Sequence, residues 1–434
     1  MNENKIRSGA NGAGKDGWEK VYEYRLLYAS TAQTPLTMRM ELTMRDQVAP
    51  EHLQRATDAT LLRYPYFAVT LEKVEGEYYF APNRQPLTVK PLADKCVLGS
   101  KDNRRHLVAV DYEGKTIGVD FAHFLTDGDG AYHFLRTLIH YYVSFAYQVT
   151  LDRTGIRLLG DPIPQEELAP VPEDIPLPPL HRGDGAANAL LLTSDRYEPV
   201  LHHFVLPERE FVAYAKSLGA TPNVLAAIFA DKILRKVTGD DQTPVRVVIC
   251  VNERHALGLE AAHQCLVGGA VLTFDKDGED LPLPELAKRM RASLKERTAS
   301  EAVLTNVTAL RGLTAKLCSF PDDKERAAFS TEIREYAAKT LSATVSYVGK
   351  ANFGAAEEYV EDFVTVAMAS SPLLFELSAV GGKIALDLIR PDPNEECAVE
   401  LQRILQEIGI PYDYKGARPL DLPQVELPWI ESER

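Results

Sequence analysis

The order of apolar and polar positions predicts strands and helices that alternate along the whole chain. An alternating stretch at 36–44 is typical of a half-buried strand, and Pro50 suits the first turn of a helix that ends near Arg63. Glu75-Gly76 lies between two strand-like stretches and predicts a hairpin turn. The strands predicted in the first half lie at 36–44, 67–74, 77–82, 106–112 and 116–122.

A proline-rich segment at 166–196 interrupts this pattern, and we expect it to be an extended crossover linker. A chain of 434 residues is long for one core, which favours two domains, at 18–165 and 197–434, behind a disordered tail at 1–17. The second half is predicted to contain strands at 201–206, 245–251, 343–348, 373–380 and 383–388, and helices at 208–218, from Pro222 onward, and at 283–298, 305–317, 322–339 and 395–408.

Composition is that of an ordinary soluble protein and narrows the choice of partners. Apolar residues make up 45% and charged residues 25% of the sequence. The formal net charge of −14 argues against a nucleic-acid-binding protein, which needs a concentrated basic surface. We expect no membrane span, because no stretch of about 20 apolar residues occurs, and no signal peptide, because the start is polar. The five cysteines form no C-x-x-C pair, so we expect a reduced, cytoplasmic location.

The stretch that begins at Ile117 has the arrangement of a site at the mouth of a cavity. An apolar strand ends at Ala122, His123 follows it, and residues 126–130 (TDGDG) form a tight turn before a helical pattern. A histidine in this place suits a general base, because its pKa is near neutrality. The same residues also fit a purely structural arrangement, in which His123 completes the strand end and Asp127 caps the helix.

Two further patterns could indicate a nucleotide-binding loop or a metal site, and we favour neither. Gly9 to Lys15 has the spacing of a phosphate-binding loop, but Asp16 stands where Ser or Thr would hold magnesium and no buried strand precedes it. His133 and His140 lie on the predicted helix beyond His123, with no acidic ligand at a matching step, so we expect no metal site.

The segment His123-Phe-Leu-Thr-Asp127-Gly128 matches the His-x-x-x-Asp-Gly motif of the coenzyme A-dependent acyltransferases. That superfamily includes chloramphenicol acetyltransferase, peptide-synthetase condensation domains and alcohol O-acyltransferases. The block at 63–89 resembles bacterial alcohol O-acetyltransferase-like proteins, and the segments 215–223 and 251–254 follow in the order of the superfamily's second domain. The resemblance implies an α/β (α+β) fold of two chloramphenicol-acetyltransferase-like domains, with mixed sheets flanked by helices and an active-site channel at their interface.

The same resemblance implies a role for each motif residue. His123 would be the general base, and Asp127, followed by Gly128, would hold the turn. Arg63, at the end of the first long helix, would form an ion pair with Asp127 or be a solvated arginine at the helix end. Ser346 lies in a Ser-x-x-Gly segment where the superfamily has a channel-facing element; it would donate to an oxyanion or be a strand serine without a role.

Ala122 stands where condensation domains have a first histidine, and this difference favours an O-acyltransferase. We therefore expect an enzyme that transfers an acyl group, with acetyl the first choice, from acyl-CoA to a small alcohol or amine acceptor. Acyl-CoA would be a cosubstrate, and we expect neither a permanently bound cofactor nor a metal. Two alternatives keep the fold: a transferase that uses an acyl thioester on a separate carrier protein, and a binding protein without catalytic activity.

Overall fold

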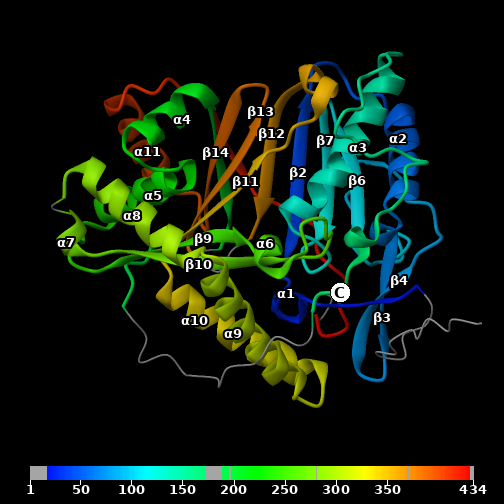
Figure 1. Ribbon diagram of the computed structural model, residues 1–434, viewed down its shortest axis with the longest axis horizontal. Helices are drawn as coiled ribbons and strands as arrows, with labels where there is room; N and C mark the ends of the chain where they lie inside the picture. The colour runs from blue at the N-terminus through cyan, green and yellow to red at the C-terminus, as the bar shows by residue number, and fades with distance from the viewer. Residues whose placement is uncertain (1–16, 173–187, 195–196, 280, 369–370, 431–434) are drawn as a thin grey trace, which may run out of the picture.

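Two large β-sheets stand side by side, and helices cover the outer sides of the pair (Figure 1). The computed structural model describes residues 17–172, 188–194, 197–279, 281–368 and 371–430. The expected disordered tail at 1–17 lies outside the described residues except for Gly17. The segment from Gly9 to Lys15, with the spacing of a phosphate-binding loop, is part of that tail. Positions 173–187 and 195–196 of the expected linker also lie outside them.

The first sheet is built around the strand that leads to His123. Its neighbouring strands are antiparallel except at the edge, where β5 runs parallel to β6. In spatial order the strands are β12 (Val360–Ala367), β2 (Thr37–Met44), β7 (Thr116–Ala122), β6 (Val108–Glu113) and β5 (Lys90–Pro91). A small antiparallel sheet contains β1 (Glu19–Lys20), β4 (Glu77–Pro82) and β3 (Val69–Val74).

Helices α2 and α3 pack on each other and share the core of the first sheet. Helix α2 begins at Pro50 because proline fits a first helical turn, and it ends at Arg63 because Pro65 follows closely. Phe134 of α3 packs edge-on against Phe121 of β7, with ring centroids 5.6 Å apart. The helices here are α1 (Tyr24–Ala29), α2 (Pro50–Arg63) and α3 (Gly128–Ala146), with 3-10 helices η1 (Pro65–Phe67), η2 (Leu92–Asp94) and η3 (Gln165–Leu168).

The second sheet mixes parallel and antiparallel strands. Strand β11 runs parallel to both of its neighbours, β9 and β13, and the other neighbouring pairs are antiparallel. In spatial order the strands are β10 (Val267–Phe274), β9 (Val245–Asn252), β11 (Ala343–Lys350), β13 (Leu373–Val380), β14 (Lys383–Arg390), β8 (Val200–Pro207) and β15 (Asp413–Pro419).

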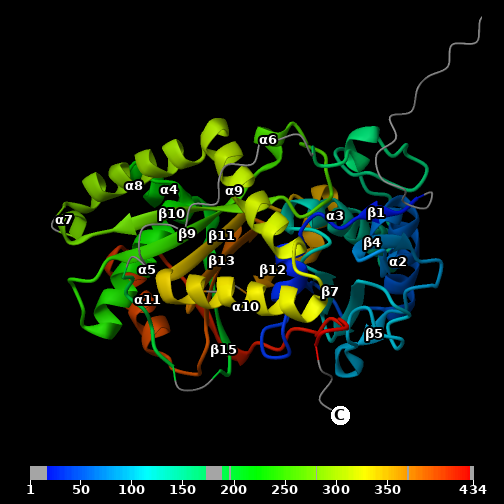
Figure 2. The ribbon, with the colours of Figure 1, turned by 90° about the horizontal axis from the view of Figure 1, so that it is seen from below.

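Helix α5 covers the middle of the second sheet, where it contacts β9, β11 and β13. Helices α9 and α10 extend toward the first half of the chain, and both contact α1 (Figure 2). The helices of this half are α4 (Glu208–Ser217), α5 (Pro222–Thr238), α6 (Arg254–Leu257), α7 (Lys276–Glu279), α8 (Leu283–Arg297), α9 (Ser300–Cys318), α10 (Asp323–Thr340) and α11 (Glu396–Glu407), with the 3-10 helix η4 (Gly354–Tyr359).

Strand β12 comes from the second half of the sequence but lies in the first sheet. It pairs antiparallel with β2, where Phe363 stands opposite Leu42. Phe363 also joins the apolar core of the first half, as does Val425 near the end of the chain. The domain limits 18–165 and 197–434 remain a prediction. Strand β12 connects the two halves of the chain, because it comes from the second half and pairs with β2 of the first.

The two sheets meet where β12 faces β13 and β14. A small apolar cluster fills the contact, with members from β8, β12, β13, β14 and the segment 420–422. Beside it, the His203 imidazole of β8 lies 2.7 Å from Asp362 of β12 and 2.5 Å from Asp387 of β14. Apolar packing and a charged triad thus join the sheets.

The α/β class and most of the expected elements are confirmed. The hairpin at Glu75-Gly76, the strand before His123 and the helix after it lie where the sequence predicts them. Strands β10, β12 and β15 are additional to the expected ones. Two glycines in β10, and a glycine and a proline in β15, weaken the strand pattern there, because both residue types are depleted in strands.

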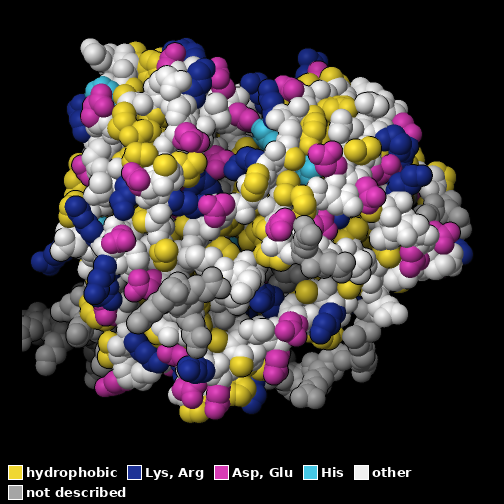
Figure 3. All heavy atoms as spheres, turned by 180° about the vertical axis from the view of Figure 1, so that it is seen from behind, with side chains coloured by type: hydrophobic (Ala, Val, Ile, Leu, Met, Phe, Trp, Pro, Cys, Tyr) yellow, Lys and Arg dark blue, Asp and Glu magenta, His cyan; other side chains and the backbone are white. Residues whose placement is uncertain are grey.

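The charges on the molecular surface are mixed in sign. On the face shown in Figure 3, acidic and basic side chains are interspersed, with hydrophobic side chains between them. None of the helices in the described residues combines the length and the apolar character needed to cross a membrane.

Candidate active site

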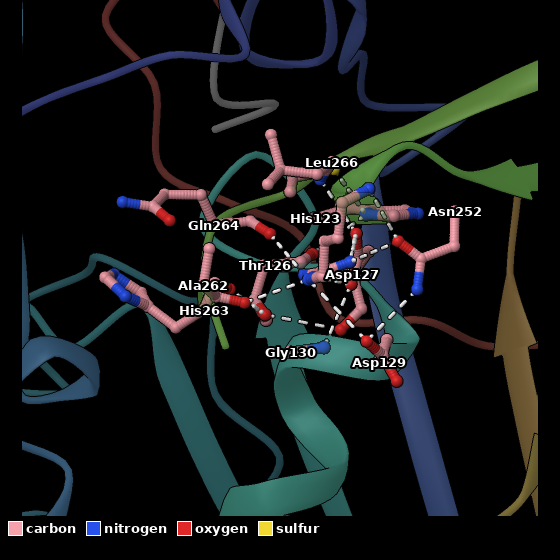
Figure 4. Close-up of polar contacts among 12 residues, drawn as sticks. His123, Thr126, Asp127, Asp129, Gly130, Asn252, Ala262, His263, Gln264 and Leu266 are labelled. Atoms are coloured by element: carbon pink, nitrogen blue, oxygen red, sulfur yellow. Dashed lines mark hydrogen bonds and ion pairs between the residues drawn. The ribbon is translucent and has the colours of Figure 1, made fainter. Parts of the chain in front are cut away.

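His123 and the turn after it connect β7 to α3 (Figure 4). The backbone N–H of His123 donates to the Leu36 carbonyl at 3.0 Å, which extends the pairing of β7 with the chain before β2. Asp127 is the N-cap of α3, because its Oδ1 accepts the backbone N–H of Gly130 at 3.0 Å. The strand-end and helix-cap roles that the sequence left open are therefore both present.

Among the described residues, the imidazole of His123 is held through Nδ1 alone. Its Nδ1 lies 3.1 Å from the backbone oxygen of Thr126. A carbonyl oxygen can only accept, so Nδ1 carries the proton and Nε2 of the neutral ring keeps its lone pair. The thiol of Cys265 lies 3.8 Å from the same Nδ1. The structure therefore leaves Nε2 as the nitrogen that can take a proton.

Asp127 forms a buried, bidentate ion pair with Arg254, the first residue of α6. The two Asp127 oxygens each accept from an Arg254 guanidinium nitrogen at 2.8 Å, and Oδ2 also accepts the backbone N–H of Leu266 at 2.7 Å. Burial alone would raise the pKa of Asp127, but the Arg254 charge and these hydrogen bonds hold it below its usual value. Asp127 is thus an ionised structural anchor that ties the turn to the second half of the chain.

The expected ion pair between Arg63 and Asp127 is wrong. Arg63 is buried and pairs instead with Glu167 of η3 at 2.8 Å. Tyr66 and Arg157 also bond to the Glu167 carboxylate. Arg63 therefore connects the end of α2 to the first residues of the expected linker, where Glu167 lies in the 3-10 helix η3.

In the sequence, Arg254 is singled out only as the last residue of the segment 251–254, Val-Asn-Glu-Arg, which resembles the superfamily's second domain. It lies two residues beyond the end of β9. A charged residue directly after a predicted strand was the feature that could have marked Arg254 as a candidate site residue. Its partner could not be read from that position, since Asp127 is distant in sequence.

Two glycines let other parts of the chain approach the turn. A Cβ at Gly128 would lie 2.4 Å from Val348 Cγ2 of β11, and a Cβ at Gly130 would lie 2.4 Å from the His263 carbonyl oxygen. That oxygen accepts a hydrogen bond from the Thr126 hydroxyl at 2.7 Å. The glycine of the motif is thus required by a close contact between the two halves of the chain.

His123 lines a cavity of about 170 Å³ that lies between the two sheets. Ser346 of β11 lines the same cavity, so the structure brings these two expected site residues together. Residues of β2, β9, β11, β12 and β13 supply most of the lining: Met38, Met40, Cys250, Thr344, Ser346, Thr365, Val366, Leu374 and Glu376. Strands from both sheets and from both halves of the sequence therefore form the walls.

A second cavity, of about 440 Å³, adjoins the Arg254–Asp127 pair. Its lining includes Glu253 and Gln264, the sequence neighbours of Arg254 and Cys265. Burial raises the pKa of Glu253 to about 7. In the part of the chain that the structure describes, no group of His, Cys, Asp and Glu side chains is arranged to hold a metal ion.

The fold of the chain is similar to that of acyltransferases of known structure, although no family model and no curated protein sequence matches it. Polyketide synthase associated protein 5 from Mycobacterium tuberculosis superposes with a TM-score of 0.61 at 14% identity, over 89% of this chain and 97% of its own. TRI101 of Fusarium sporotrichioides, determined with coenzyme A and T-2, gives 0.61 at 12% identity, over 92% and 100%.

Condensation domains share this fold too. The condensation domain of the monacolin K polyketide synthase MokA superposes with a TM-score of 0.55 at 13% identity, over 90% of this chain and 96% of its own. The chain thus has the fold of the coenzyme A-dependent acyltransferases and condensation domains, as the His-x-x-x-Asp-Gly resemblance implied.

Proposed function

We propose that this protein transfers an acyl group from acyl-CoA to an alcohol, with His123 as the general base. The observation that carries the proposal is the His123 imidazole, whose Nδ1–H is bound to Thr126 and whose Nε2 is left basic. This imidazole lines a cavity between the two sheets, on a fold similar to that of an acetyltransferase. A basic nitrogen in such a cavity suits the removal of a proton from a hydroxyl group.

In the proposed reaction, His123 Nε2 takes the proton of the acceptor hydroxyl as its oxygen attacks the thioester carbonyl carbon. A C–O bond forms and the carbonyl oxygen becomes an oxyanion. The C–S bond then breaks, the carbonyl is restored, and the proton on His123 passes to the departing thiolate. The products are an ester and free CoA, and no covalent bond to the protein is made.

The other site residues support this step without reacting. Asp127, through its pair with Arg254, keeps the turn closed and so positions His123. The Ser346 hydroxyl faces the same cavity and would donate to the oxyanion once it releases its hydrogen bond to Glu376. Asp127 and Arg254 are positioning residues in this scheme, whereas His123 and Ser346 act at the reacting atoms.

Free acyl-CoA is the preferred donor because three of the similar structures, all TRI101, contain coenzyme A, and a fourth contains ethyl coenzyme A. A carrier-bound acyl thioester is the second candidate. It is favoured by the similarity to the MokA condensation domain and to the peptide synthetase FmoA3, which gives a TM-score of 0.55 at 14% identity. Either donor presents the same thioester carbonyl to His123.

The test is acceptor-dependent release of free thiol from acetyl-CoA and longer acyl-CoAs, over a panel of alcohols and amines. We expect His123→Ala to lower kcat/KM by about 100- to 10,000-fold, the usual contribution of a general base. The matched control is His255→Ala, which removes an exposed histidine of α6. Circular dichroism would show whether both variants are folded.

Equal activity in wild type and His123→Ala would overturn the role of His123. If no CoA donor releases thiol, the same acceptors should be tested with an acylated carrier protein. Silence with both donors in folded wild-type protein would favour a binding protein without catalytic activity.

A further inference from the structure

Glu376 is a buried carboxylic acid that the proposed reaction does not use. It lies in β13, is 5% exposed, and lines the same cavity as His123. Side chains alternate between the two faces of β13: Phe375 and Leu377 join the core beneath α5, whereas Ser378 bonds to the Phe363 carbonyl of β12. Glu376 is thus on the side of the strand that faces the other sheet.

No cation among the residues that the structure describes balances this acid. Among the described residues, the Ser346 hydroxyl, the Asp387 carboxylate and a backbone bond to Ala367 act on Glu376. The guanidinium that lines the cavity, that of Arg254, is bound to Asp127. Burial raises the pKa of Glu376 to about 8, and the Ser346 bond opposes the rise. A cation placed beside this buried carboxyl group would stabilise its ionised form.

A second polar atom in the cavity also lacks a partner. The Thr365 hydroxyl of β12 is buried and has no hydrogen bond among the described residues. Buried hydroxyls are almost always bonded, so an unpaired one that lines a cavity offers a hydrogen bond to a water or to a polar group of a ligand. Glu376 and Thr365 come from the two sheets that face each other across the cavity.

The rest of the lining is largely apolar. Met38 and Met40 of β2, Val366 of β12 and Leu374 of β13 contribute side chains without hydrogen-bonding groups. A cavity of about 170 Å³ with this lining suits a short carbon chain that carries one strongly polar group.

We propose that the acceptor is an amino alcohol, whose protonated amine binds Glu376 while its hydroxyl is presented to His123. This inference rests on the proposed acyl transfer and names the class of its acceptor. An acyl chain offers no N–H donor, so the acid and the free hydroxyl recognise the acceptor and not the acyl group. Thr365 accepts a second hydrogen bond from the same ammonium group.

The test compares dimethylamino alcohols of increasing chain length with the neutral alcohols in which a CH group replaces the N–H⁺. A tertiary amine keeps its charge and its N–H donor but cannot form a stable amide, so thiol release reports acylation of oxygen. We expect wild type to have at least a tenfold higher kcat/KM for the best amino alcohol than for its neutral counterpart.

Glu376→Gln should reduce that preference at least tenfold, measured as the ratio of kcat/KM for the amino alcohol to kcat/KM for its neutral counterpart. Thr365→Val should leave the preference for dimethylamino alcohols unchanged, because Glu376 takes their single N–H. It should weaken only the binding of a primary amino alcohol, whose ammonium group has further N–H donors. The control variant is Glu301→Gln, which neutralises an exposed glutamate of α9 and should change neither value. No preference for the amine in wild type, or an unchanged preference in Glu376→Gln, overturns the proposal.

A binding measurement separates this proposal from the acyl transfer itself. Millimolar dimethylaminoethanol or dimethylaminopropanol, without any acyl donor, should raise the Tm of wild type but not of Glu376→Gln. An equal rise in both, or none in wild type, overturns the amine site. If the rise depends on Glu376 while no donor releases thiol, the site stands and the proposed function fails.

Discussion

At the scale of single residues, the contact between Asp127 and Arg254 connects the site to both halves of the chain. A buried ion pair is costly to break on one side, because the remaining charge is left without a partner. The pair is buried on both sides, with 3% of the Arg254 side chain and 6% of the Asp127 side chain exposed.

We expect Arg254→Met to lower the free energy of unfolding by about 3–5 kcal/mol for this reason. In a double-mutant cycle, Asp127→Asn with Arg254→Met should cost less than the sum of the single variants by about 1–3 kcal/mol. Asp127→Asn with Arg63→Met should be additive, because Arg63 pairs with Glu167. Denaturant unfolding measures each value, and coupling of Asp127 to Arg63 alone would contradict the structure.

Gly128 provides a second residue-scale test. Its added Cβ would meet Val348 Cγ2, so Gly128→Ala should cost about 1–3 kcal/mol of stability through overpacking. Adding Val348→Ala to Gly128→Ala should restore part of the lost stability, because it removes the clashing methyl group. Thermal unfolding of the two single variants and the double variant measures these stabilities. A double variant no more stable than Gly128→Ala would exclude the clash as the cause.

At the scale of elements, β12 determines how the cavity is enclosed. It completes the first sheet beside β2 and faces β13 and β14, so it contributes to one wall of the cavity and to the contact between the sheets. Its Phe363 packs against Tyr132 of α3 and Phe353, with ring centroids 5.8 and 5.6 Å apart.

Phe363→Ala should therefore lower the free energy of unfolding by about 3–5 kcal/mol, the usual cost of a cavity at a buried aromatic residue. Glu361→Ala, an exposed change in the same strand, should stay within about 0.5 kcal/mol. Denaturant titrations of both variants supply the comparison. Similar small losses in the two would mean that β12 does not contribute to the first core.

At the scale of the whole molecule, the triad of His203, Asp362 and Asp387 joins the two sheets. The two carboxylates outweigh burial and raise the pKa of His203 to about 10 from its ordinary 6.5. A raised histidine pKa adds stability that is complete below about pH 6.5 and is lost as the pH rises toward 10.

His203→Gln should therefore destabilise the protein more at pH 7 than at pH 10, by on the order of 3 kcal/mol. Urea unfolding of wild type and variant at several pH values between these limits tests the sign. A difference that is constant, or that grows with pH, would show that His203 is not charged in the folded protein.

The sequence predicted the elements well because each depends on neighbours a few positions away. Apolar periodicity located β7 and α3, the glycines located the turn between them, and proline marked the ends of α2. The same local signals were weak in β10 and β15, which contain glycine or proline, and nothing local could indicate which sheet β12 would join.

By itself, the sequence thus determined the strand, the turn and the helix around His123 and, through the His-x-x-x-Asp-Gly resemblance, the fold. Only the tertiary structure decided that Asp127 pairs with Arg254, that Arg63 pairs with Glu167, and that Glu376 lines the cavity of His123. The physical reason is that these contacts depend on which distant segments the sheets bring together. Local propensity fixes an element, whereas the burial of its faces against other elements fixes the partners of its charged side chains.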